Sequence, residues 1–169
     1  MDKNLDELLN SGFRYALSLS HDPQEAEDLL HDACVNILDS DGPMQKGYLF
    51  TTIRNRFIDR YRRSKRVLFM SLEGDRDDDG RPQEVPSDER WQMPDIIASD
   101  HLHEALAELR PDERETIFLA VVEEYTAQEI ADMTDRPRGT ILSLLHRTRK
   151  KLRKSLSERE VYSNDAGQT

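Results

Sequence analysis

The chain has 169 residues, with 34 acidic and 24 basic side chains, so its formal net charge is −10. Charged residues make up 34% of the chain and hydrophobic residues 36%, against about 25% charged residues in ordinary globular domains. This composition supports only a thin core, which favours small helical modules over one bulky α/β enzyme core. The single cysteine excludes a disulfide framework and any zinc site built from several cysteines, and we expect no metal and no cofactor.

Membrane insertion is not expected. The longest purely apolar run covers residues 117–122, far short of the roughly 20 residues that span a bilayer. The first residues lack the basic start and the apolar stretch of a signal peptide. The sequence therefore predicts a cytoplasmic protein.

Three helices are predicted in the first part of the chain. Apolar residues recur at helical spacing from Leu5 to Leu17. A second helix begins at Asp22, because Asp is a good N-cap and the following proline fits a first helical turn. A third helix runs from about Gln45 to Arg66. Its predicted buried side consists of Tyr48, Leu49, Ile53, Phe57, Ile58 and Tyr61. These helices predict a first module over residues 1–66.

The helical pattern then stops. Residues 67–95 are rich in Gly, Pro and acidic side chains, and such a segment buries too little apolar area to offset the entropy lost on ordering. It is therefore predicted to be an acidic flexible linker between two modules.

A second helical module is predicted over residues 96–156, followed by a disordered tail, 157–169. Thr126 and Glu129 have the spacing of a capping box in front of a short helix. Asp135 follows in a turn, where Asp tolerates the left-handed conformation, and Pro137 starts a long helix. A short helix, a turn and a long helix together indicate a helix-turn-helix. The predicted fold is thus all-α, with two small helical domains.

Two compact basic segments stand out of this acidic chain. Residues 54–66 carry seven basic side chains and one acidic one, and residues 136–154 carry eight basic side chains and no acidic one. A solvated helix face usually mixes both signs of charge. Blocks of one sign favour a polyanion such as the backbone of duplex DNA, and the long helix of a helix-turn-helix fits the major groove.

The sequence motifs resemble those of the group IV, or extracytoplasmic-function (ECF), sigma factors of bacterial RNA polymerase. Residues 25–33 (EAEDLLHDA) and 48–63 (YLFTTIRNRFIDRYRR) are similar to two helices of sigma region 2. Residues 105–115 (ALAELRPDERE) and 137–152 (PRGTILSLLHRTRKKL) are similar to the start and the DNA-reading helix of region 4. The motifs follow each other in the order of the family.

The resemblance implies a set of partners and site residues. Core RNA polymerase would be bound through its β′ clamp helices and its β flap, with the clamp contact made by Asp28, Leu29, Asp32 and Ala33. The promoter −10 element would be recognised by Asn55, Arg56, Asp59, Arg62 and Arg63. The −35 element would be recognised by Arg138, Thr140, Ser143, Arg147, Arg149 and Lys150. An anti-sigma factor is a further expected partner.

Alternatives to this function stay open at the level of the sequence. Leu142 and Leu144 stand where the family has basic or polar residues, and leucine cannot donate a hydrogen bond to DNA. A sigma-like decoy that binds an anti-sigma factor without engaging DNA is one alternative, and a stand-alone helix-turn-helix regulator is another. For Asp59, an ion pair with Arg62 or Arg63 is the alternative to a DNA contact. No catalytic constellation is present, so the chain is not expected to be an enzyme.

Overall fold

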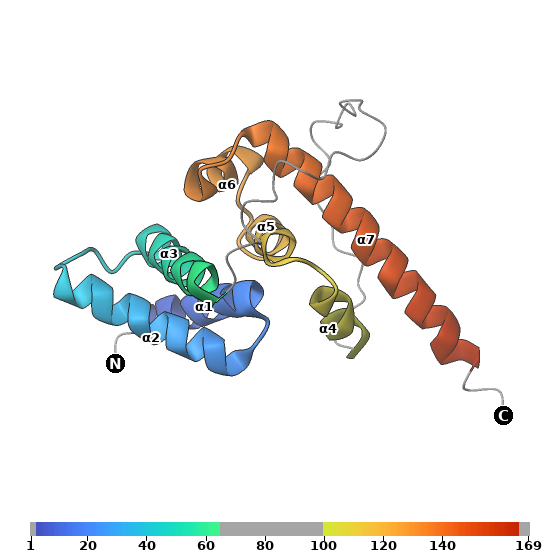
Figure 1. Ribbon diagram of the computed structural model, residues 1–169, viewed down its shortest axis with the longest axis horizontal. Helices are drawn as coiled ribbons and strands as arrows, with labels where there is room; N and C mark the ends of the chain where they lie inside the picture. The colour runs from blue at the N-terminus through green and yellow to red at the C-terminus, as the bar shows by residue number, and fades with distance from the viewer. Residues whose placement is uncertain (1–2, 65–99, 166–169) are drawn as a thin grey trace. The chain divides into compact units, whose positions relative to one another are not determined.

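The computed structural model describes residues 3–64 and 100–165 (Figure 1). These residues form two compact units, which are described separately. Within the described ranges all regular elements are helices, so the predicted all-α class is confirmed. The predicted linker lies outside the described residues, and the module boundaries stay predictions. No helix of the described chain has the length and apolarity needed to cross a membrane.

The first unit is a three-helix module of α1 (Lys3–Ser20), α2 (Pro23–Asp39) and α3 (Lys46–Ser64). Asp22 caps α2 as predicted, since its carboxylate accepts a hydrogen bond of 2.8 Å from the backbone N–H of Glu25. The three helices pack on one another around the stacked rings of Tyr15 and Phe50, whose centroids lie 4.4 Å apart. Other side chains fully buried in this core are Ala16, Ala26, Leu29, Ala33, Ile37, Leu49 and Ile53.

The second unit contains α4 (Asp100–Ala107), α5 (Pro111–Val121), α6 (Ala127–Thr134) and α7 (Arg138–Asp165). The capping box of α6 is confirmed. Thr126 Oγ1 accepts from the Glu129 N–H at 3.2 Å, and the Glu129 carboxylate accepts from the Thr126 N–H at 2.7 Å. Asp135 ends α6 in the left-handed conformation with φ 53°, as predicted. The turn between α6 and α7 therefore has the geometry of a helix-turn-helix.

The predicted disordered tail is wrong for residues 157–165, because α7 continues as a helix to Asp165. As far as Arg159, a polar cluster joins α7 to α4. Arg159 forms ion pairs with Glu104 and Glu108 of α4, and the Ser155 hydroxyl donates to Glu108 at 2.9 Å. These tertiary contacts stabilise helical turns that the local sequence leaves polar.

This cluster predicts a loss of stability in acid. The hydrogen bond from Ser155 and then the guanidinium of Arg159 lower the pKa of the Glu108 carboxyl. A carboxyl with a lowered pKa in the folded state contributes stability at pH values above its ordinary pKa, and this contribution disappears as the pH falls through the folded pKa. We therefore expect the melting temperatures of the wild type and Glu108→Gln to differ at pH 7 and to converge as the pH falls from the ordinary glutamate pKa of about 4.3 through the lowered pKa of the folded protein. A difference that persists unchanged in acid would contradict this.

A buried hydroxyl in α7 predicts a stabilising substitution. Thr148 is fully buried, and its Oγ1 has no hydrogen-bond partner within the described part of the chain. An unsatisfied buried polar group lowers stability by about 1 to 3 kcal/mol, and valine has nearly the same shape. Thr148→Val is therefore expected to raise the free energy of unfolding by about 1 kcal/mol, measured by urea denaturation. Equal or lower stability would show that the hydroxyl finds a partner.

Candidate nucleic-acid interface

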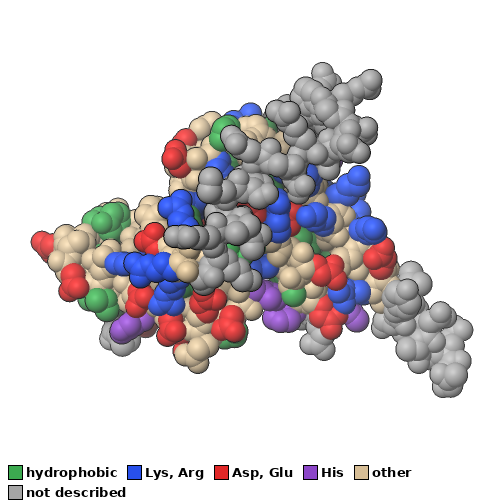
Figure 2. All heavy atoms as spheres, in the orientation of Figure 1, with side chains coloured by type: hydrophobic (Ala, Val, Ile, Leu, Met, Phe, Trp, Pro, Cys, Tyr) green, Lys and Arg blue, Asp and Glu red, His purple; other side chains and the backbone are tan. Residues whose placement is uncertain are grey.

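The first candidate surface is the outer face of α3. At 100° per residue, five positions form a stripe on the side of α3 opposite the core. All five are exposed, namely Tyr48, Thr51, Asn55, Asp59 and Arg62. Figure 2 shows basic side chains gathered over this helix. The stripe, called here the α3 outer face, combines an aromatic ring, an amide and a guanidinium, which are the groups that contact unpaired bases and phosphates.

The predicted burial of Tyr48 is wrong. Its side chain is 42% exposed, because Tyr48 precedes the fully buried Leu49 and is turned by about 100° from it. The ring lies against the turn that joins α2 and α3. A Cβ atom added to Gly42 would lie 2.9 Å from Cε1 of this ring, so a larger residue at this position would have to displace the ring. Tyr48 and Asn55 are seven positions apart, which is about two helical turns. This spacing, rather than the aromatic character of Tyr48, was the sequence signal that places its side chain on the outer face.

The flank of α3 that faces α2 carries the remaining predicted −10 residues. Arg56 is half-buried and Arg63 is exposed. On the same flank Arg60, absent from the predicted set, forms an ion pair with Asp32 of α2. Asp59 makes no ion pair with Arg62 or Arg63 in the described residues. The alternative of a local ion pair for Asp59 therefore gains no support.

The second candidate surface is the outer face of α7. Ser143, His146 and Lys150 are exposed and lie on one stripe, opposite the buried Ile141 and Leu145. Arg138 is exposed at the start of the helix, while Thr140, Arg147 and Arg149 are half-buried on its two flanks. Two exposed cations outside the predicted set, Arg153 and Lys154, continue the basic surface along the helix.

Leu144 does not belong to this outer face. Its side chain is fully buried, together with Ile141 and Leu145, because Leu144 and Leu145 lie about 60° and about 40° to either side of Ile141 around the helix. The expectation that Leu144 replaces a DNA-facing polar residue is therefore wrong, and Leu142 is half-buried. Of the two leucines that argued against −35 binding in the sequence, Leu144 therefore no longer does so.

A third surface, on α2, has a different character. Asp28, His31, Val35 and Leu38 are exposed and follow one another at helical spacing, with Leu38 70% and Val35 42% exposed. We call these four residues the α2 outer face. Leu29 and Ala33 are fully buried in the core of the unit, so in this structure neither side chain of the predicted pair is exposed to a partner. Asp32 lies on the flank of α2 and pairs with Arg60.

These surfaces are suited to binding rather than to chemistry. The two basic faces offer cations and hydrogen-bond donors, and the α2 outer face offers apolar side chains beside a carboxylate. Within residues 3–64 and 100–165, no three His, Cys, Asp or Glu side chains are grouped in a way that would hold a metal ion.

Two family models match the chain in the order of its units. The model described as Sigma-70 region 2 matches residues 5–67, and the model described as Sigma-70, region 4 matches residues 99–152. The first match covers the three-helix module and the second covers the helix-turn-helix. The protein is therefore of the sigma-70 class of transcription factors.

Individual relatives narrow this class. SigL of Mycobacterium tuberculosis, an ECF RNA polymerase sigma factor, is 30% identical over 153 residues, which cover 86% of this chain and 82% of the relative. SigE of Mycolicibacterium smegmatis is 30% identical over 150 residues, which cover 86% of this chain but only 57% of the relative. The chain belongs to the ECF sigma factors of RNA polymerase, which confirms the resemblance seen in its motifs.

A solved structure has the same fold. It is the sigma factor RpoE of Bartonella quintana in complex with the anti-sigma factor NepR. Its sequence is 27% identical, the TM-score is 0.65, and the match covers 92% of this chain and 95% of that chain.

Proposed function

We propose that this chain binds core RNA polymerase and directs it to promoters by contacting the −10 element with unit 1 and the −35 element with unit 2. The observation that carries the proposal is the separation of chemistry within unit 1. Its basic and aromatic face lies on α3, and its acidic and apolar face lies on α2. A protein that joins DNA to an enzyme needs two such surfaces at once.

The −10 contact is assigned to the α3 outer face. Strand separation exposes bases that need a stacking surface and hydrogen bonds to their edges, and it leaves phosphates that need cations. Tyr48 offers the ring, Asn55 offers the amide, and Arg62 offers the charge. Arg56 and Arg63 add positive charge along the adjacent flank, where they favour the backbone of either strand.

The −35 contact is assigned to the outer face of α7. The N-terminal part of a recognition helix reaches base edges in the major groove, and later basic residues reach phosphates. Arg138 and Ser143 lie in the N-terminal part of α7, where side chains reach base edges. Lys150 lies further along the helix, where side chains reach phosphates. Thr140, Arg147 and Arg149, on the flanks, are placed to contact the walls of the groove.

The polymerase contact is assigned to the α2 outer face, where Val35 and Leu38 form an apolar centre beside Asp28. Interfaces of this kind place apolar anchors at the centre and charges at the rim, where charge sets orientation. The β′ clamp helices are the proposed partner of this face, and the β flap is the proposed partner of unit 2. The chain acts without catalytic chemistry of its own, in the cytoplasm with the polymerase.

An anti-sigma factor is a further proposed partner. The structural relative RpoE is held in a complex with the anti-sigma factor NepR, which supports a regulator of this kind. The decoy alternative rests on Leu142, Leu144 and the net charge of −10. The burial of Leu144 removes part of that argument, and the exposed basic faces favour DNA binding.

Reconstitution tests the proposal. The full chain is mixed with core polymerase of its host, and the holoenzyme is used to select fragments from host genomic DNA. We expect selection of a small set of fragments, opened over about ten base pairs upstream of a transcript start, and none with core polymerase alone. Selection without polymerase would favour a stand-alone regulator, and binding to polymerase without any DNA opening would favour a decoy.

A further inference from the structure

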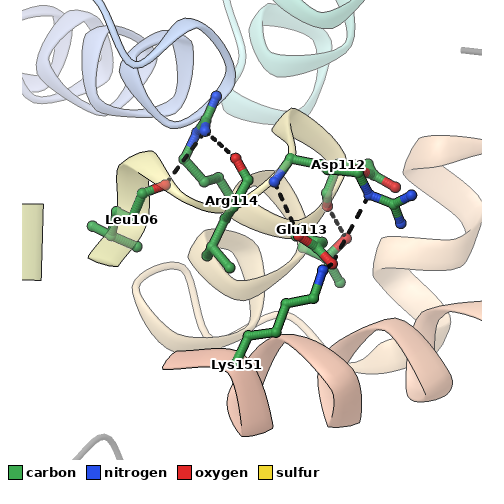
Figure 3. A network of polar contacts seen from close by, with 8 residues as sticks. Leu106, Asp112, Glu113, Arg114 and Lys151 are labelled. Atoms are coloured by element: carbon green, nitrogen blue, oxygen red, sulfur yellow. Dashed lines mark hydrogen bonds and ion pairs between the residues drawn. The ribbon is translucent and has the colours of Figure 1, made fainter. Parts of the chain in front are cut away.

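One carboxylate of unit 2 is buried where α5 meets α7. The Glu113 side chain is 1% exposed, and its Oε2 accepts a hydrogen bond of 2.9 Å from the backbone N–H of Arg110 at the start of α5. Its Oε1 lies 2.5 Å from the ammonium Nζ of Lys151 of α7. Figure 3 shows Lys151 extending from α7 toward this carboxylate. Glu113 therefore joins the start of one helix to the middle of another.

The contact pairs one cation of α7 with α5, while the Lys151 side chain stays 53% exposed. Lys151 belongs to the basic segment 136–154, yet its charged end is turned to α5 and paired there. Its neighbour Lys150 lies about 100° away around the helix, on the exposed stripe with Ser143 and His146. The sequence alone does not separate these two lysines, whereas the structure gives them different partners.

We propose that Glu113 is a positioning residue for DNA recognition, because its ion pair with Lys151 fixes the rotation of α7 and so determines which side chains face the bases. This inference rests on the proposed −35 function of unit 2. A rotation of α7 that carried Lys151 toward DNA would break the 2.5 Å contact and leave the buried Glu113 carboxylate with only the guanidinium of Arg110, whose Nε lies 3.9 Å from Oε1. Removing the nearer partner of a buried charge is unfavourable.

The remaining contacts of α7 leave room for such a role. Its buried stripe includes Ile141, Leu144, Leu145, Thr148, Leu152 and Leu156, and this stripe sets the approximate phase of the helix against the core. A charged hydrogen bond has a narrower geometry. Buried polar pairs are known to set register at helix interfaces in some proteins, and Glu113 has the matching arrangement here.

The experiment uses the full chain in the holoenzyme and three variants. Glu113→Gln with Lys151→Met removes both charges together and keeps an acceptor for the Arg110 N–H. Lys151→Arg keeps the pair. Lys150→Met, the matched control, removes an exposed cation one position away. Each is tested on a duplex carrying a selected promoter fragment, and on the same duplex with its −35 region permuted, over a range of salt concentrations.

Two readouts distinguish the possible roles. The preference for the intact over the permuted duplex reports base reading, and the slope of log affinity against log salt reports phosphate contacts. We expect the double variant to lose preference about tenfold, which corresponds to about 1.4 kcal/mol, with an unchanged slope. Lys151→Arg should keep both values. Lys150→Met should keep most of the preference and lower the slope by about 0.9.

Other results overturn the inference. A double variant with unchanged preference and only a lower melting temperature would make the pair merely structural. A double variant whose slope falls like that of Lys150→Met would make Lys151 a phosphate contact. If permutation does not change wild-type binding and Lys150→Met does not change the slope, the −35 assignment itself is wrong and the positioning role fails with it.

Discussion

Replacing Leu38 by Glu is expected to weaken binding of the chain to core RNA polymerase about 100-fold while unit 1 stays folded. Leu38 is 70% exposed, so the new carboxylate remains in water in the free protein. In the proposed complex the same position is the apolar centre of the α2 outer face. Truncation of such a residue typically removes about 2 kcal/mol or more of binding energy, and burying an unpaired carboxylate adds to the loss. Titration of labelled chain with core polymerase measures the effect.

A matched control exists on α1. Leu5 is 37% exposed and lies on a different helix of the same unit, so Leu5→Glu introduces the same charge away from the proposed contact. We expect Leu5→Glu to bind polymerase like the wild type, and both variants to melt within a few degrees of it. Equal losses in both variants, or none in Leu38→Glu, would remove the α2 outer face as the docking surface.

The helix ends of this protein could be predicted from local sequence because their signals are local. Asp22 in front of Pro23 and the Thr126–Glu129 pair each satisfy backbone N–H groups within three residues, and such bonds do not depend on distant contacts. Asp135, which ends α6 in the left-handed conformation, is also a local signal, because the preference of Asp for this conformation does not depend on distant contacts. Local chemistry was sufficient to place the start of α2 and the turn between α6 and α7.

The faces of the helices were harder to predict. A motif match marks a stretch of residues without saying which of them point outward, so Leu29 and Ala33 were grouped with the exposed Asp28. Their helical phase separates them, because Leu29 and Ala33 share the stripe of Ala26 and Ile37, all fully buried. Strict use of that phase would have pointed to Val35 and Leu38 instead.

The extension of α7 could not be predicted from local sequence at all. Residues 157–165 have no apolar stripe of their own, and the predicted state was disorder. The helix is stabilised by the ion pairs of Arg159 with α4, across more than 50 positions of chain. Lys151 presents the same difficulty, since its partner Glu113 lies 38 positions earlier. Long-range ion pairs of this kind leave no periodic signal.

Replacing Tyr48 by Ala is expected to reduce open-complex formation about 10- to 100-fold. Stacking of an unpaired base on an aromatic ring contributes about 1 to 3 kcal/mol, and the exposed Tyr48 ring is the one on the α3 outer face. The loss should fall on the single-stranded state. We therefore expect a large decrease in affinity of the holoenzyme for a single-stranded −10 oligonucleotide and a small one for closed duplex at low temperature.

Two further variants separate stacking from packing, because the Tyr48 ring also lies over Gly42. Tyr48→Phe keeps both the ring and the turn contact, and we expect it to open promoters nearly like the wild type. Tyr48→Leu keeps apolar bulk over Gly42 but has no π face, and we expect it to behave like Tyr48→Ala on single-stranded DNA with a melting temperature near that of the wild type. If Tyr48→Leu opens promoters normally, the ring only stabilises the turn, and base stacking must be assigned to another part of unit 1.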